Sequence, residues 1–401
     1  MPRATIGAMT TTGSAAPPPL TARALNRATL ARQVLLAREP LGVEEAVRRV
    51  VALQAQLPGS PYVALWNRLE GFDPALVDAA VDGFRLVRST LMRITLHLVH
   101  VDDHGPFRVA MEPTLRGSRL RDRRFAEAGL TPEDADRLLP ELLAYAARPR
   151  TGAELQARCG EGWGGVGLTP VAWRLLRQYA PLWYVPTGPP WSYGSSPGFV
   201  AAAPEPVPTA PEAAAEGLET LAGRYLAGFG PASAADLAQF ALVQRGRART
   251  ALDALVRAGT AEVLAGPDGT VLYDLPGAVR PDGETPAPPR LMAMWDSTLL
   301  AYADRSRIIP PAYRKEVIRN NGDSLPTLLV DGYVAGVWRP VPGGIEASAF
   351  RPLAAGEWAG LAAEAASLGA MLADRDPRVY GRFDHWWAKG VPAVETRLLP
   401  Y

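Results

Sequence analysis

The feature of this sequence that most constrains its fold is a pattern of helical segments followed by two short strands, which occurs three times. In the first occurrence, apolar residues at helical spacing in 43–53 and 74–81 precede the β-branched segment 87–101. The second occurrence has predicted helices at 131–147, 151–158 and 170–179, followed by strands at 182–185 and 191–200. The third has predicted helices at 216–228, 233–240 and 247–258, followed by strands at 261–264 and 271–275. Helices that end in a strand pair are compatible with a winged helix-turn-helix.

The rest of the chain supplies a spacer and a region of strands. A proline-rich stretch at 203–216 predicts a linker or long loop. Further strands are predicted at 291–295, 327–330, 333–338 and 345–350, with a last helix at 354–372. We therefore predict an α+β protein with a disordered tail at 1–24, winged-helix units at 25–125, 126–202 and 217–285, a linker at 203–216, and a C-terminal region of β-strands with a final helix at 286–401.

Composition excludes several classes of protein. No stretch approaches the roughly 18 apolar residues that a membrane helix needs, so we predict no membrane span. Cys159 is the single cysteine, which excludes a disulfide framework and a thiolate metal cluster and favours a reducing, cytoplasmic compartment. The first 20 residues lack the continuous apolar run of a signal peptide, so we interpret them as part of the disordered tail.

Two glycine motifs match known site patterns, but their surroundings argue against both. Residues 162–167 satisfy the dinucleotide pattern G-x-G-x-x-G, yet a predicted helix precedes them where that site requires a strand. Residues 194–198 satisfy the hydrolase pattern G-x-S-x-G. There the residue after the serine must donate a backbone N–H to the oxyanion, and Pro197 has none. We predict neither site.

Three histidines, His97, His100 and His104, lie close in sequence to Asp102 and Asp103, which suggests a metal site. The segment around His97 and His100 has the character of a strand, in which residues three apart point to opposite faces. We therefore predict no metal, and we interpret His97 as a packed or hydrogen-bonded side chain of a wing.

The most unusual short segment is Gln54-Ala55-Gln56. Its plainest interpretation is two surface glutamines at the end of a helix. Pro58, however, favours extended backbone just before it, and in an extended chain both glutamine side chains project to the same side. Two amides on one side can hold a water molecule, so the segment has either a structural or a water-binding role.

Charge is nearly balanced over the whole chain but not along it. The formal net charge is +1, and all but two of the 42 Lys and Arg residues are arginine, a residue suited to bidentate phosphate recognition. Residues 115–124 hold five arginines against one aspartate, and 244–258 and 303–319 have a similar excess, whereas 201–220 carries four glutamates and no cation. One such cluster is as compatible with a solvated face as with a binding site, but three of them favour a basic, phosphate-facing surface.

The cations that we select from these clusters as candidate DNA-binding residues are Arg116, Arg119, Arg121, Arg123, Arg124, Arg245, Arg247, Arg305, Arg307, Arg314 and Lys315.

Several longer stretches, in this order and spacing, resemble one protein family, the bacterial winged-helix DNA glycosylases of the AlkZ and YcaQ superfamily. The resemblance covers nearly the whole chain from about residue 25. It rests on Q-x-Q at 54–56, R-x-T-L-H-L at 93–98, FGPASAADLAQF at 229–240, WDSTLLAYADRSRIIP at 295–310 and LPTLLVDGYVAGVWRP at 325–340.

The resemblance implies three tandem winged helices that form a concave, basic DNA-binding surface. It also implies a monofunctional glycosylase that excises bulky or crosslinking alkylpurines. Glutamine at both outer positions of the motif is typical of the AlkZ-like branch, so Gln54 and Gln56 are the implied catalytic residues. Many AlkZ-like proteins resemble self-resistance enzymes of organisms that make DNA-alkylating antibiotics. We expect double-stranded DNA with alkylated purines as the partner, and no cofactor, no metal and no membrane.

The implied chemistry is consistent with amides in place of carboxylates. Alkylation at N7 places a positive charge on guanine and makes it a good leaving group, so a site that orients water at C1′ suffices. Bulky adducts need not enter a tight pocket, so an open cleft suffices as well. The hairpin that turns at Asp331, Gly332 and Tyr333 is a candidate for entering a DNA groove.

A second class of function fits the same units. A non-catalytic winged-helix DNA-binding protein, either a transcriptional regulator or a binder that shields lesions, would also have basic winged helices. Regulators usually dimerise on palindromic half-sites. A chain with three such units in tandem needs no partner, so we expect a monomer, located in the cytoplasm with the nucleoid.

Overall fold

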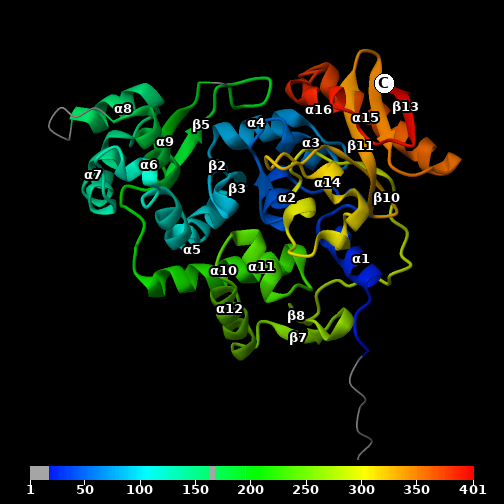
Figure 1. Ribbon diagram of the computed structural model, residues 1–401, viewed down its shortest axis with the longest axis horizontal. Helices are drawn as coiled ribbons and strands as arrows, with labels where there is room; N and C mark the ends of the chain where they lie inside the picture. Colours follow the sequence, from blue (N-terminus) through cyan, green and yellow to red (C-terminus); the bar gives the residue numbers. More distant parts are fainter. Residues whose placement is uncertain (1–17, 162–167, 195) are drawn as a thin grey trace, which may run out of the picture.

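The computed structural model describes residues 18–161, 168–194 and 196–401, which form a mixed fold of helices and four antiparallel sheets (Figure 1). The glycine-rich residues 162–167 and Ser195 of the hydrolase-like pattern lie outside the described residues. In Figure 1, the C-terminal sheet and the part that contains α7, α8 and α9 lie at opposite ends of the molecule, with helices from the first part of the chain between them.

The first part of the chain has a sheet in the order β1-β3-β2. Its elements are α1 (Ala22–Arg32), α2 (Val43–Arg49), β1 (Leu53–Gln54), α3 (Ser60–Trp66), α4 (Pro74–Asp82), β2 (Leu86–Thr90), the short 3-10 helix η1 (Met92–Ile94), β3 (Leu96–His100), α5 (Val101–Arg119) and α6 (Arg123–Ala126). The helix predicted at 43–53 ends at Arg49, and the strand predicted at 87–101 is a hairpin. A left-handed residue, Val51 (φ 74°), separates α2 from β1, so extended backbone begins at Leu53.

Helix α5 is absent from the sequence prediction because Pro106 and Pro113 lie inside it. It packs closely on α10 (Pro211–Phe229). A Cβ atom on Gly217 would lie 2.7 Å from the backbone nitrogen of Ala110 and 2.9 Å from the carbonyl oxygen of Pro106. The missing side chain therefore sets how closely these two helices approach each other.

The second and third parts of the chain follow the predicted order of helices and strands. Their elements are α7 (Pro132–Tyr145), β4 (Arg150–Thr151), α8 (Gly152–Glu161), α9 (Pro170–Tyr179), β5 (Leu182–Val185) and β6 (Gly198–Ala201), then α10, α11 (Ala234–Ala241), α12 (Arg245–Arg257), β7 (Glu262–Ala265), η2 (Pro267–Gly269) and β8 (Val271–Asp274). The sheets have the orders β4-β6-β5 and β7-β8. Of the strand predicted at 191–200, only the last residues are in a strand, β6.

Two predicted irregular segments are partly helical. The predicted linker at 203–216 extends into α10, which begins at Pro211, because proline at the first helical position fits the helix without loss of a hydrogen bond. The predicted tail at 1–24 also overlaps α1, which begins at Ala22 and is capped by the side chain of Thr21. Ordered backbone starts earlier still, since Leu20 N donates to Ala265 O at 2.8 Å.

The C-terminal region has one five-stranded sheet in the order β13-β12-β11-β10-β9. Its elements are β9 (Arg290–Leu291), α13 (Ser297–Leu300), η3 (Arg305–Arg307), η4 (Pro311–Tyr313), α14 (Arg314–Val317), β10 (Thr327–Val330), β11 (Tyr333–Val341), β12 (Gly344–Ala349), α15 (Ala355–Ala373), η5 (Gly381–Phe383), α16 (His385–Ala388) and β13 (Glu395–Pro400). The predicted strands at 327–330, 333–338 and 345–350 and the last helix are confirmed. Strand β13, which pairs with β12, was not predicted.

Two hydrophobic clusters cross the predicted domain boundaries. In the first, residues of the N-terminal helices such as Leu30 and Val63 share a core with Trp338 and Leu399 of the C-terminal sheet. In the second, α5 and the helices of the second part pack with α10, α11 and α12. The predicted units are therefore continuous in sequence but do not have separate cores.

Candidate active site

The Gln54 side chain is buried and has a fixed orientation. Strand β1 places Gln54 opposite His97 on β3. The side-chain oxygen Oε1 of Gln54 accepts a hydrogen bond from Nη2 of Arg93 at 2.8 Å. Because a guanidinium group only donates, the oxygen of the amide must face Arg93, and its NH2 group must point away. Gln54 thus lies in extended backbone, at the last position of β1, and not at the end of a helix.

Arg93 connects this strand to a distant helix. Besides Gln54, its guanidinium contacts Nε2 of His97 at 3.2 Å and donates to the backbone oxygen of Phe240, in α11, at 3.0 Å. The backbone of Arg93 (φ 52°) and that of the next residue, Ile94 (φ 58°), are both left-handed. Such conformations are unusual for residues with side chains of this size, so the backbone of the turn between β2 and β3 is locally strained. With this backbone, the Arg93 side chain points toward Gln54.

His97 is neutral, and its contacts define its tautomer. The pKa of His97 lies well below the usual 6.5 because the ring is buried and Arg93 is positively charged beside it. Its Nδ1 lies 3.1 Å from the carbonyl oxygen of Thr95, which can only accept, so Nδ1 carries the proton. Nε2 is then free to accept from Arg93. The acceptors His97 Nε2 and Phe240 O therefore hold the Arg93 guanidinium in its orientation toward Gln54.

Gln56 is exposed and lies beside the same hairpin. Its Oε1 is 3.4 Å from the backbone nitrogen of Leu96, a long hydrogen bond, while Ala55 N donates to Leu96 O at 2.7 Å. Ala55 is buried in the first hydrophobic cluster. Gln54 therefore contacts the turn between β2 and β3, Gln56 contacts the first residue of β3, and the residue between the two glutamines packs into the core.

The surroundings of Gln54 are positively charged. Burial, together with the nearby charge of Arg305, lowers the pKa of Arg93 to about 10. Burial and the charge of Arg314 lower the pKa of Arg305 in the same way. Within the described part of the chain, no carboxylate forms an ion pair with any of these three arginines. The predicted cluster at 303–319 thus contributes unneutralised charge next to Gln54.

Several of the other predicted DNA-binding cations are engaged within the protein. Arg116 forms a two-point ion pair with Asp136, at 2.7 and 2.6 Å. Arg307 donates to the Pro231 carbonyl oxygen and lies over the ring of Tyr302. Pairs with acids also occupy two exposed arginines of the first cluster, Arg123 with Glu127 and Arg124 with Asp122. The Nε atom of Arg119 is buried without a partner.

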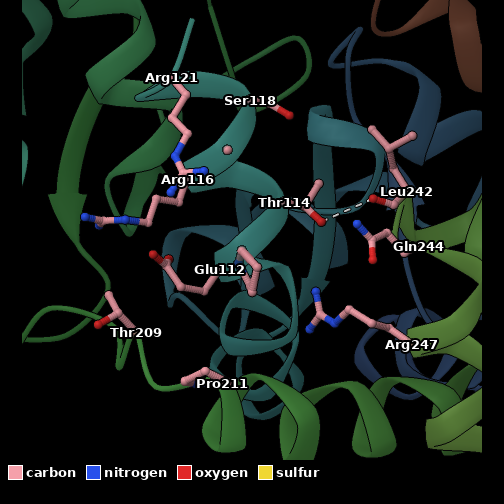
Figure 2. A pocket seen from close by; sticks show the side chains of 12 residues that line it. Glu112, Thr114, Arg116, Ser118, Arg121, Thr209, Pro211, Leu242, Gln244 and Arg247 are labelled. Carbon is pink, nitrogen blue, oxygen red and sulfur yellow. Dashed lines mark hydrogen bonds between the residues drawn. The ribbon is translucent and has the colours of Figure 1, made fainter. Parts of the chain in front are cut away.

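The predicted clusters at 115–124 and 244–258 meet at one pocket of about 570 Å³. Figure 2 shows Arg116 and Arg121 on one side of it and Gln244 and Arg247 on the other. Within the described residues, Arg121, Arg245, Arg247 and Lys315 have no ion pair. The structure thus brings two of the three clusters together and places the third beside Gln54.

The turn at Asp331, Gly332 and Tyr333 is anchored inside the protein. The carboxylate of Asp331 accepts from Arg23 at 2.8 Å and also pairs with Arg27. Asn26 donates to the Gly332 carbonyl oxygen at 2.9 Å, and Gly332 itself is buried. These contacts fasten the turn to α1, and its role as a hairpin that enters a DNA groove stays a prediction.

The three histidines do not gather around one point. His97 contacts Arg93, His100 accepts from Asp102 N at the start of α5, and His104 packs edge-on against Trp183. The described residues include no group of three or more His, Cys, Asp or Glu side chains suited to hold a metal ion. They also include no helix long and apolar enough to cross a membrane.

Sequence reasoning missed Arg93 and Phe240 as partners of Gln54. Arg93 and His97 stand four residues apart in the stretch R-x-T-L-H-L, which drew attention only through the family resemblance. Only the left-handed backbone at Arg93 and the packing of α11 show that this arginine turns toward Gln54.

Comparison with known proteins gives three related findings. The sequence model of the family DNA glycosylase AlkZ-like matches residues 47–371. An interstrand DNA cross-link repair glycosylase from Streptomyces sahachiroi is 25% identical over 333 residues, which cover 77% of this chain and 85% of that protein. The solved structure of Streptomyces sahachiroi DNA glycosylase AlkZ has a TM-score of 0.70 at 21% identity, and the match covers 88% of this chain and 97% of that one.

Proposed function

Since the chain belongs to the AlkZ-like DNA glycosylase family, it is a DNA glycosylase, and we propose that its substrate is double-stranded DNA with bulky N7-alkylguanine. In this proposal the enzyme is monofunctional: it hydrolyses the N-glycosidic bond with water and needs no cofactor. Gln54 and Gln56 are the residues that contact the reacting water.

The observation that carries the proposal is the orientation of the Gln54 amide. One lone pair of its oxygen accepts from Arg93, which leaves the second lone pair for a proton of water and the NH2 group for an acceptor on the substrate. Gln56 lies two residues along the same edge, and its amide is exposed. Together the two amides can hold one water in a defined direction, which accelerates a reaction by positioning and not by base strength.

N7-alkylation explains why positioning suffices. The alkylated guanine is cationic, so when the bond from C1′ to N9 breaks, the bonding electrons neutralise the base as it leaves. The sugar becomes an oxocarbenium-like cation, the water oxygen bonds to C1′, and the extra proton passes to solvent. Neither a strong acid nor a strong base is required at the site.

The positive charge around Gln54 fits a site for DNA only if phosphates lie close to it. Arg93, Arg305 and Arg314 would by themselves oppose a cationic sugar. The phosphates on either side of that sugar are anionic, and they offset this repulsion when the arginines contact them. We therefore assign Arg305 and Arg314 to the DNA backbone next to the lesion.

We extend the proposal to the whole molecule. The three small sheets with their helices act as winged-helix units, and the faces that carry the free arginines line a concave DNA-binding surface. In support of this, the sheets recur in the predicted order along the chain. The protein acts as a monomer in the cytoplasm, where the chromosomal DNA is. By analogy with the cross-link repair relative, it unhooks interstrand crosslinks. From the family resemblance alone, we also propose that it protects its host from a DNA-alkylating natural product.

The test of this function is release of free base from duplex oligonucleotides with a single N7-alkylguanine, a bulky adduct or an interstrand crosslink. We expect the wild-type protein to release N7-alkylguanine and to leave an abasic site without strand cleavage. Gln54→Ala should lower the single-turnover rate about 100-fold, and Gln56→Ala about 10-fold, since Gln56 is exposed and less constrained.

Gln33→Ala is the matched control, since this buried glutamine donates to the Gly228 carbonyl oxygen and not to Gln54, Gln56 or Arg93. Its effect should appear in the melting temperature, not in the rate. The proposal is refuted if the wild-type protein binds alkylated duplex without releasing base, the behaviour of a lesion-shielding binder. It is refuted equally if the variant without both glutamines releases base as fast as the wild type.

A further inference from the structure

The pocket between α5 and α12 has a charge distribution suited to an anion. Two charged side chains on its wall, Glu112 and Arg116, are paired within the protein. Glu112 is buried, where it accepts from Arg108 at 2.6 Å and from the hydroxyl of Tyr179 at 2.7 Å. Arg116 is matched by Asp136. Two positive charges, those of Arg121 and Arg247, remain without an ion pair among the described residues.

The remaining lining groups are hydrogen-bond donors of the kind that phosphate oxygens accept. Ser118 contributes a hydroxyl group and Gln244 an amide group to the wall. The first turn of α12 contributes backbone N–H groups as well. Gln244 caps this helix without a side-chain hydrogen bond, and the first backbone bond into it is from Ala248 N to Gln244 O at 3.1 Å. The amides before Ala248 are thus unused, and the helix dipole adds to the positive charge of the two arginines.

The pocket is connected to Gln54 through the end of α11. Arg93 bridges Gln54 and the Phe240 carbonyl oxygen, and two residues further on the Leu242 carbonyl oxygen accepts from Thr114 at 3.2 Å on the wall of the pocket (Figure 2). Two residues span at most about 7 Å, so Gln54 and the pocket lie within about 20 Å of each other. Along a DNA strand, which carries a phosphate every 3.4 Å of axis, this is a reach of about six nucleotides.

We propose that this pocket is a phosphate-binding site that holds one backbone phosphodiester of the bound DNA, within about six nucleotides of the sugar at Gln54. Arg121 and Arg247 bind the phosphate from opposite walls. The side-chain amide of Gln244 and the backbone N–H groups of the first turn of α12 donate hydrogen bonds to its oxygens. The site fixes the register of the duplex on the enzyme, so that the lesion lies at Gln54 when the phosphate fills the pocket. This inference rests on the proposed function, because it assumes DNA as the partner.

The test compares a double variant, Arg121→Gln with Arg247→Gln, with Arg257→Gln. Arg257 is an exposed arginine in the last turn of the same helix, and no ion pair is found for it among the described residues. It lies about 15 Å from Arg247 along the helix axis, at 1.5 Å per residue. All variants should melt within about 2 °C of the wild type, since none of these side chains anchors the core.

The first measurement is binding of undamaged duplex at several salt concentrations. The double variant should bind about tenfold more weakly, and the slope of log affinity against log salt concentration should become shallower by about one, the contribution of one phosphate. Arg257→Gln should leave both quantities unchanged. An equal loss in the control and in the double variant, or no loss in either, would overturn the proposal.

The second measurement identifies the phosphate. A series of duplexes carries one uncharged methylphosphonate at each position up to six nucleotides on either side of an N7-alkylguanine, in both strands. The wild type should bind more weakly when one position, or two adjacent positions, lose their charge, and the double variant should be insensitive to those same substitutions. If no position distinguishes the two proteins, the pocket does not hold a backbone phosphate.

Two further outcomes separate this proposal from the function and from free anions. Binding of undamaged duplex does not require catalysis, so a wild-type protein that binds but releases no base contradicts the proposed function while the pocket passes its own test. If inorganic phosphate binds to the wild type but not to the double variant, while no methylphosphonate position distinguishes the two proteins, the pocket takes a free anion and the backbone assignment is wrong.

Discussion

The role of Arg93 makes the sharpest prediction about the reaction. If this arginine fixes the direction of the Gln54 amide, replacing it should slow base release without weakening DNA binding to the same degree. Arg93→Lys keeps the positive charge, but an ammonium group cannot reach Gln54 Oε1, His97 Nε2 and Phe240 O with the planar fork of a guanidinium. Arg93→Asn removes the charge while tolerating the left-handed backbone (φ 52°).

The magnitudes follow from these contacts. A displacement of a positioned group by about 1 Å lowers a rate about 100-fold, which corresponds to about 2.7 kcal/mol. Loss of two of the three hydrogen bonds of this guanidinium should lower the free energy of unfolding by about 2–3 kcal/mol. We therefore expect Arg93→Lys to release base about 100-fold more slowly in single turnover, with a half-saturating enzyme concentration within threefold of the wild type.

The pH profile distinguishes positioning from a purely structural role. Deprotonation takes away the charge of Arg93 and one of its N–H donors, and its pKa is about 10, so the wild-type rate should stay level up to about pH 9 and fall as the pH approaches 10. A lysine in the same buried, positively charged position titrates at lower pH, so the rate of Arg93→Lys should already fall between pH 7 and 9. A lysine variant with the wild-type rate and the wild-type pH profile would refute the reasoning.

Two predictions concern stability. Burial, with a contribution from Arg108, lowers the pKa of His104 from 6.5 to about 3, so below pH 6.5 the unfolded chain binds a proton that the folded protein does not. The contribution of this histidine to stability is therefore complete above pH 6.5. In urea unfolding, the free energy of unfolding should fall by about 2 kcal/mol between pH 7.5 and 5, at about 1.36 kcal/mol per pH unit below pH 6.5. His104→Phe should remove this decrease, and an equally steep decrease in that variant would contradict the assignment. Gly217→Ala should destabilise the protein by about 1–3 kcal/mol because its Cβ would meet backbone atoms of α5 at 2.7 and 2.9 Å. In the control Gly223→Ala, on the same helix, the new Cβ meets nothing within 4 Å and should raise the melting temperature slightly; equal effects of the two substitutions would show that α5 and α10 are not tightly packed.

The sequence predicted those parts of the fold whose signals are local. Helices with apolar periodicity and strands bounded by turn residues were found, such as α9 with its cap Thr169 and the strand β10. Helix α5 was missed because Pro106 and Pro113 argue against a helix, and only packing on α10 overrides that local signal. Strand β13 was missed for a related reason, since it is defined by its pairing with β12 about 50 residues earlier in the chain.

The candidate site, like the fold, has some features with a local sequence signal and others that depend on tertiary contacts. Residue type and the nearby proline drew attention to Gln54 and Gln56, but only the family resemblance implied a catalytic role for them. Counting charges along the sequence located the three arginine clusters, but it could not tell which arginines form ion pairs with acidic side chains. Asp136, for example, lies 20 residues from Arg116 and neutralises it. The contact between Arg93 and Gln54 depends on a strained turn and a distant helix, and no sequence pattern specifies it.

The core shared by the N-terminal helices and the C-terminal sheet has a consequence for synthesis on the ribosome. Leu30 and Val63 emerge early, yet their apolar partners Trp338 and Leu399 are made about 300 residues later. At about 5–20 residues per second, the first helices wait roughly 15–60 s for the strands that cover them. During that interval their apolar faces are available to chaperones or to neighbouring nascent chains. Slower growth at low temperature, or co-expression of a holding chaperone, should therefore raise the yield of folded protein more than any change to the surface of the finished molecule.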